Sequence, residues 1–190
     1  MKVIQILKKE HYLILQTVDL LARSRDYLEK GVIVPSEFYE KAMRFCHDFA
    51  DRFHHYKEEF LLFGLLAHKK EGRLDAVMGA LRYQHERCSQ CVAEIGNVLN
   101  TDRKYDEMTV TFLLENLSVY VSLLRRHIYL ENTVFFPMAA RSLTEEEKDS
   151  LSDQFTAEEA RLDFQGSVLE ENRKIVIELE DILTKGKADD

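Results

Sequence analysis

Four stretches of this chain, at about residues 3–29, 37–68, 73–100 and 107–140, repeat apolar residues at alternating steps of three and four. This spacing places apolar side chains along one face of an α-helix and is typical of helices that pack at shallow angles. The linkers between the stretches are short, so neighbouring helices should run antiparallel. The sequence therefore predicts an all-α fold built on an up-down-up-down four-helix bundle.

A histidine interrupts the apolar face of each predicted helix, and a glutamate joins it on the second and fourth. A side chain of this kind needs a partner, because an unpaired buried carboxylate costs several kcal/mol. Counting residues from each linker, at about 1.5 Å per residue, places these side chains near one depth in the bundle. We therefore expect a shared metal site. Its six candidate ligands are His11, His54, Glu58, His85, His127 and Glu131.

Two of the predicted helices carry the same pair, a histidine followed four residues later by a glutamate. Residues four apart lie about one turn from each other on a helix face and can reach one ion together. The pairs are His54 with Glu58 and His127 with Glu131. A second pairing in the first of these helices, His55 with Glu59, stays open as an alternative.

The donor set favours iron, manganese or zinc, which take imidazole and carboxylate ligands together. Two ions a few Å apart are bridged most simply by carboxylates from facing helices, so we expect Glu58 and Glu131 to bridge and the four histidines to be terminal ligands. No cysteine belongs to this set, which argues against an iron–sulfur cluster. The Glu-x-x-His motif of ferritin-like di-iron proteins does not occur in the chain.

Four motifs, in this order along about residues 5–140, resemble the hemerythrin family, and specifically its hemerythrin-like domains with HHE-type motifs. They are Glu10-His11, FHHYKEEFLLF from Phe53 to Phe63, QHE from Gln84 to Glu86, and HIYLENTVFFP from His127 to Pro137. The resemblance implies a bundle that holds two non-haem iron ions bridged by carboxylates, with manganese or zinc less favoured. It also implies that the centre binds dioxygen or related small ligands.

One departure from the family pattern bears on function. The oxygen-carrying members take a fifth histidine from a His-x-x-x-His pair on the third helix, whereas here the positions four residues either side of His85 are Leu81 and Ser89. Four histidines with two glutamates look like the members linked to iron repair and nitric oxide stress. This difference puts reversible oxygen carriage in doubt.

Three functions follow from these patterns. The first is a di-iron protein that binds, senses or detoxifies dioxygen, nitric oxide or peroxide. The second is an iron donor that repairs iron–sulfur clusters under nitrosative or oxidative stress. The third is a regulatory bundle whose metal is structural or absent. The sequence favours a metal- and ligand-binding protein over a classical enzyme.

Further side chains are candidates for lining the pocket or for bonding to the ligands. His47 and Tyr120 each lie one heptad before a predicted ligand, and His47 could itself become a fifth ligand, but ordinary core packing is favoured for both. Cys88 and Cys91 have the spacing of a redox motif, yet they lie in mid-helix, away from the N-terminus that lowers a thiol pKa. The candidates are His47, His55, Glu59, Cys88 and Tyr120.

Composition narrows the partners and the compartment. The net charge of −8 and the lack of a basic run argue against nucleic acid or an anionic membrane surface as a partner. No stretch approaches 18 apolar residues, so we expect no transmembrane helix, and the N-terminus lacks the pattern of a signal peptide. Three cysteines, an odd number, fit a reducing compartment, and the cytoplasm is the expected location.

A further helical region follows the four predicted helices. Thr144 and Glu147 have the spacing of a capping box, and the helix that begins there extends to about Lys185 with a break near Gly166. We expect residues 1–142 to form the bundle and residues 143–190 to form a helical extension. Its apolar residues predict that it packs on the bundle or on a second copy of the chain, as in a homodimer.

Overall fold

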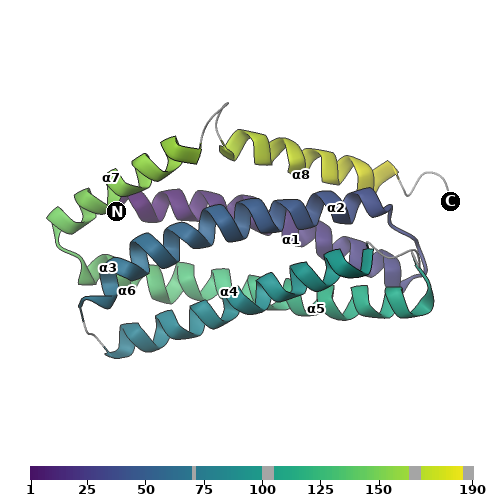
Figure 1. The fold of residues 1–190 in the computed structure, drawn as a ribbon, viewed down its shortest axis with the longest axis horizontal. Helices are drawn as coiled ribbons and strands as arrows, with labels where there is room; N and C mark the ends of the chain where they lie inside the picture. The colour runs from purple at the N-terminus through teal and green to yellow at the C-terminus, as the bar shows by residue number, and fades with distance from the viewer. Residues whose placement is uncertain (70–71, 100–104, 163–167, 186–190) are drawn as a thin grey trace.

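The computed structural model describes residues 1–69, 72–99, 105–162 and 168–185 (Figure 1). Helices and short turns make up these residues, and the prediction of an all-α bundle is confirmed. The first rod of the bundle is α1 (Lys2–Glu29) and the third is α4 (Gly72–Leu99). The second runs from α2 (Ser36–Phe45) to α3 (Phe63–Ala67), and the fourth from α5 (Glu107–Leu130) to α6 (Phe136–Ser142).

The four rods alternate in direction, as Figure 1 shows, and the contacts between them close a ring. Contacts join α1 to α5, α5 to α4 and α4 to α2, and α1 also contacts the segment that follows α2. The antiparallel order expected from the short linkers is therefore the one observed. Every rod can send side chains to the same central axis.

The second and fourth rods are helical over nearly all of the predicted ranges 37–68 and 107–140, but they are not α-helical throughout. The second rod is π-helical in its middle part, at Cys46–His55 and Lys57–Leu62, and the fourth rod is π-helical at Glu131–Phe135. The N–H that follows each segment bonds to the carbonyl five residues back. Pro137 explains the wider turn in the fourth rod, because it has no N–H and its ring displaces the carbonyl four residues back.

The apolar core consists of two clusters with a polar layer between them. Along α1, Leu7 belongs to one cluster and Ile14 to the other, and the buried His11 lies between them. The same change of cluster occurs in α4 between Leu81 and Cys88. The bundle therefore holds its candidate ligands in a layer closed by apolar side chains above and below.

Two further helices, α7 (Glu145–Leu162) and α8 (Val168–Lys185), lie along the bundle. α7 contacts α1 and the π-helical segment Lys57–Leu62, whereas α8 contacts α1 and α2. Leu151 and Phe155 of α7 are fully buried in one apolar cluster, and Leu179 of α8 is buried in the other. The extension thus completes the core at both ends of the bundle.

The start of α7 has the predicted capping box. The Thr144 N–H donates to a carboxylate oxygen of Glu147 at 2.8 Å, and the Glu147 N–H donates to the Thr144 hydroxyl at 3.3 Å. The predicted break near Gly166 lies outside the described residues.

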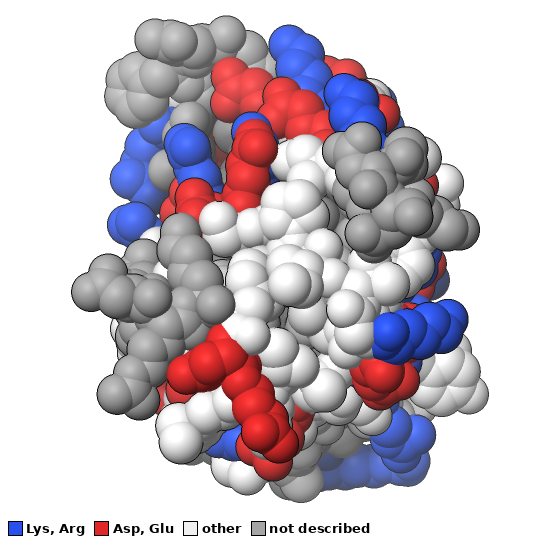
Figure 2. Space-filling view, turned by 90° about the vertical axis from the view of Figure 1, so that its right-hand side faces the viewer, with Lys and Arg blue, Asp and Glu red and all other residues white. Residues whose placement is uncertain are grey.

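An uncharged region of the surface lies at one end of the bundle (Figure 2). Figure 2 shows the end at which α1, α4 and α8 finish and α2 and α5 begin, with acidic and basic side chains around the uncharged surface. Ile33, Met108 and Phe112, from segments that meet at this end, are exposed. Among the described helices, none has the length and apolar character needed to cross a membrane.

Candidate metal centre

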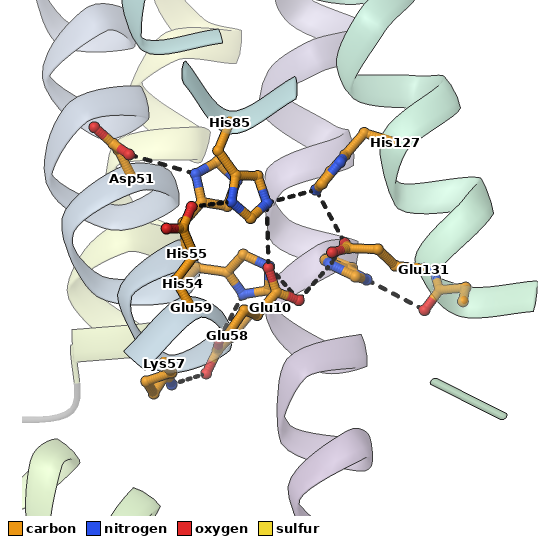
Figure 3. A network of polar contacts seen from close by, with 12 residues as sticks. Glu10, Asp51, His54, His55, Lys57, Glu58, Glu59, His85, His127 and Glu131 are labelled. Carbon is orange, nitrogen blue, oxygen red and sulfur yellow. Dashed lines mark hydrogen bonds and ion pairs between the residues drawn. The ribbon is translucent and has the colours of Figure 1, made fainter. Parts of the chain in front are cut away.

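The six predicted ligands meet at one level of the bundle, and His55 joins them (Figure 3). Each of the seven side chains belongs to a residue that is at most 4% exposed. Their ligand atoms form two groups, in each of which the atoms lie within 4.8 Å of one another. The first ligand group is His11, His54, Glu58 and Glu131, and the second is His55, Glu58, His85 and His127.

The two carboxylates lie between the groups. Oε1 of Glu58 is 3.6 Å from Nε2 of His54, and Oε2 of Glu58 is 3.6 Å from Nε2 of His85. One oxygen of Glu131 is 3.1 Å from Nε2 of His11 and 3.1 Å from Nε2 of His127. Each carboxylate therefore faces imidazoles of both groups, which is the arrangement that bridging between two ions requires.

His55 enters the site because the second rod is π-helical here. The pairings of His54 and of His55 were treated as alternatives, but the structure places His54 in the first ligand group and His55 in the second. Adjacent residues of an α-helix point about 100° apart, and the wider turn of a π-helix reduces this angle. A fifth histidine is thus present, from the second rod instead of the third. The sequence signal was the His-His doublet, in which each histidine precedes a glutamate by four.

All five histidines turn Nδ1 toward an oxygen outside the site. An Nδ1–H that donates to such an oxygen fixes the tautomer and leaves the Nε2 lone pair for a metal. Glu59, the alternative ligand, takes this outer role. The pairs are His11 with Asn132 at 3.2 Å, His54 with Glu10 at 2.8 Å, His55 with Asp51 at 3.4 Å, His85 with Glu59 at 2.5 Å, and His127 with Gln84 at 3.0 Å.

Burial keeps three of the site imidazoles in the form that binds metal. It lowers the pKa of His55, and it lowers the pKa of His54 and of His85 well below the ordinary value. Neutral imidazole is the ligand form of histidine, so these rings need lose no proton when a metal arrives.

The pKa values of the two buried carboxylates are shifted in opposite directions. Burial and the neighbouring Glu131 raise the pKa of Glu58 well above its ordinary value. Burial would also raise the pKa of Glu131, but His127 and His11 hold it well below its ordinary value. The two carboxylates thus share the same few imidazole partners in one closed layer. Metal cations would stabilise the charged form of both carboxylates.

Several buried polar atoms of the first ligand group have no hydrogen-bond partner. Buried polar groups are nearly always hydrogen-bonded, so such a cluster calls for a further partner. Metal ions held in the two groups would give each of these atoms a partner, and the donor set therefore fits the metal that the sequence implied. The atoms are Nε2 of His11, Nε2 of His54, and both carboxylate oxygens of Glu58 and of Glu131.

The remaining candidates lie beside the centre. The His47 side chain is 55% exposed and pairs with Asp48 at 2.7 Å, so the idea that it could be a fifth ligand was wrong. Tyr120 and Cys88 are buried, and together with His47 and His55 they line a cavity of about 80 Å³ next to the second ligand group. Burial raises the pKa of the Cys88 thiol, and the three cysteines of the chain are free.

The two histidines that differ most from expectation provide a test of this geometry. His55→Ala should lower the affinity for one of two metal ions by at least about 10-fold, because it removes a donor of the second ligand group. His47→Ala should leave both ions in place, because His47 points to solvent. Metal per chain after dialysis measures the difference. Equal metal content in the two variants would exclude His55 as a ligand.

Comparison with known protein families supports metal binding at these residues. The family model of the hemerythrin HHE cation binding domain matches residues 2–139. No curated protein and no solved structure matches the chain. The matched residues include every member of both ligand groups and end before α7. The chain therefore belongs to the hemerythrin HHE cation-binding family, and its buried histidines and glutamates form a metal-binding site.

Proposed function

We propose that this chain is a non-haem di-iron protein that binds a small ligand such as dioxygen, nitric oxide or peroxide. One observation carries the proposal, namely the unequal division of imidazoles between the two ligand groups. The first group has two imidazoles and the second has three, while both carboxylates face imidazoles of the two groups. An ion in the first group would keep more positions for an external ligand than an ion in the second.

The protein's own residues would prepare this position. Bound iron would supply open coordination positions and one-electron redox changes. Glu58 and Glu131 would set the separation of the ions, and the outer oxygens at Nδ1 would keep each imidazole aimed at them. The ring of Phe136 stacks on His11 at 5.5 Å, and the fully buried Phe63 and Phe135 belong to the same apolar cluster. Such surroundings exclude water and admit small, weakly polar molecules.

Mixing the di-ferrous protein with oxygen tests this function. We expect an absorption change that reverses when oxygen is removed under vacuum, because His55 fills the second group and leaves the ligand position on one ion only. Nitric oxide or azide should compete for the same position. Stopped-flow spectroscopy measures both. Immediate and irreversible oxidation of the wild-type protein would contradict oxygen binding and would favour detoxification of oxidants.

The iron-donor function is favoured by a separate observation. An open groove of about 970 Å³ reaches His55 and His85 of the second ligand group, and Arg52, Arg82 and Arg161 are among its lining residues. An ion held there has a path to solvent and to a partner. Iron that passes to a ferrous chelator within minutes, without unfolding, would identify the protein as a donor instead of a ligand-binding centre.

A further inference from the structure

Lys57 is a fully buried cation that none of the roles described above employs. It follows the two adjacent site histidines in the second rod, and the residue is 0% exposed. Its Nζ lies 3.8 Å from the centre of the Phe53 ring and donates to the carboxylate of Glu10. Burial of an unpaired ammonium costs several kcal/mol of free energy, so the contacts that pair Lys57 require an explanation.

The contacts of Lys57 form a continuous path to the metal centre. The two carboxylate oxygens of Glu10 in α1 have different partners (Figure 3). Oε1 accepts from Lys57, and Oε2 lies 2.8 Å from Nδ1 of His54. Nε2 of His54 in turn faces Glu58. The ammonium of Lys57 therefore fixes the carboxylate that orients one imidazole of the first ligand group.

The other end of this path lies on α7. The side chain of Glu159, which is 39% exposed, accepts from Nζ of Lys57 at 3.3 Å. Phe155, one turn earlier on α7, is fully buried with its ring centre 5.6 Å from the same nitrogen. α7 lies beyond residues 2–139, to which the family model matches. A helix added to the hemerythrin bundle thus supplies two of the groups that surround Lys57.

We propose that α7 is coupled to the metal centre through Lys57, with Lys57 and Glu159 as positioning residues for His54. The series Glu159, Lys57, Glu10 and His54 is called the Lys57 relay below. The relay rests on the metal site of the proposed function but not on the identity of its external ligand. Outer partners of metal-bound histidines typically change metal affinity 10- to 100-fold. Coupling is also reciprocal, so a metal that holds His54 should in turn stabilise the docking of α7.

The chain offers a matched control for this proposal. Lys69 also joins α7 to the second rod, through Glu147 at 2.6 Å, but its partner is no part of the relay. Lys57→Met and Lys69→Met each remove one ammonium that binds α7, and only the first should affect His54. Glu159→Gln is a second relay variant, and it avoids a change in the core because Glu159 is partly exposed.

Two measurements test the coupling between α7 and the metal centre in the whole chain. Affinity for ferrous iron, and for zinc as a redox-inactive ion, should fall about 10-fold in Lys57→Met and by a smaller factor in Glu159→Gln. Hydrogen exchange of the α7 amides should slow on metal binding in the wild type and in Lys69→Met. This slowing should be reduced at least threefold in the two relay variants. Unchanged affinity and unchanged slowing in both relay variants would overturn the proposal.

A metal-free measurement separates the relay from the proposed function. A chain that binds no metal would refute the di-iron function, whereas the relay can still be read from chemical unfolding. The shifts in denaturation midpoint caused by His54→Ala and by Glu159→Gln should then fail to add in the double variant. Additive shifts would show that α7 and His54 are independent, and would overturn the relay.

Discussion

Alanine in place of Glu58 should remove both metal ions from the protein. Glu58 belongs to both ligand groups, and its two oxygens face imidazoles of different groups. A single substitution therefore takes a donor from each ion, and we expect metal affinity to fall by more than about 100-fold, beyond the range seen for outer partners. Metal per chain, measured by elemental analysis after dialysis, gives the result.

In the metal-free protein, Glu58 should destabilise the fold. Burial and Glu131 raise the pKa of Glu58, so its carboxylate is a cost to the metal-free fold. Glu58→Gln should thus raise the denaturation midpoint of the metal-free protein while it lowers that of the loaded one. Glu59→Ala is the control, because Glu59 reaches the site through the outer nitrogen of His85 and its other oxygen pairs with Arg82, outside both ligand groups. A larger metal loss in Glu59→Ala than in Glu58→Ala would show that the bridge was wrongly assigned.

Protein purified in air should contain about two iron ions per chain and absorb in the near-ultraviolet through ligand-to-metal charge transfer. The two ligand groups share Glu58, and each brings together four side chains that could hold an ion. Iron content with an optical spectrum measures this directly. A stoichiometry of one, or a metal-free protein with the same fold and stability, would contradict the two-ion centre.

Removal of the metal should also destabilise the fold. A ligand present at about 1,000 times its dissociation constant stabilises the native state by about 4 kcal/mol. For a chain of this size, that corresponds to a fall in Tm of about 10 °C on chelation. Scanning calorimetry of the loaded and stripped protein measures the shift, and restoring iron should reverse it.

The bundle and most of the site could be predicted from the sequence because both depend on helical periodicity. The three- and four-residue spacing specifies one buried face for each rod, and His11, His85 and His127 interrupt those faces. Short linkers then place these positions at one level. The structure needed nothing beyond α-helical geometry to bring these three side chains together.

His55 and Lys57 could not be predicted in this way. Both lie in or beside π-helical segments of the second rod, where a wider turn changes which neighbours face inward. The choice between His54 and His55 assumed α-helical geometry throughout, and this assumption treated as alternatives two histidines that both reach the site. Lys57 is buried by α7, and the spacing of apolar residues in α7 does not specify which surface of the bundle it covers.

The outer partners of the histidines have a consequence for how the rods align along their length. In four of the five pairs, the partner is adjacent in sequence to a ligand on one rod and bonds to a histidine of another rod. Glu10 follows this rule beside His11, and Asn132 does so beside Glu131. Apolar clusters alone tolerate sliding of one helix past its neighbour, whereas a slip of one turn, about 5.4 Å, would break several of these bonds at once. The chain therefore specifies the register of its four rods before any ion arrives.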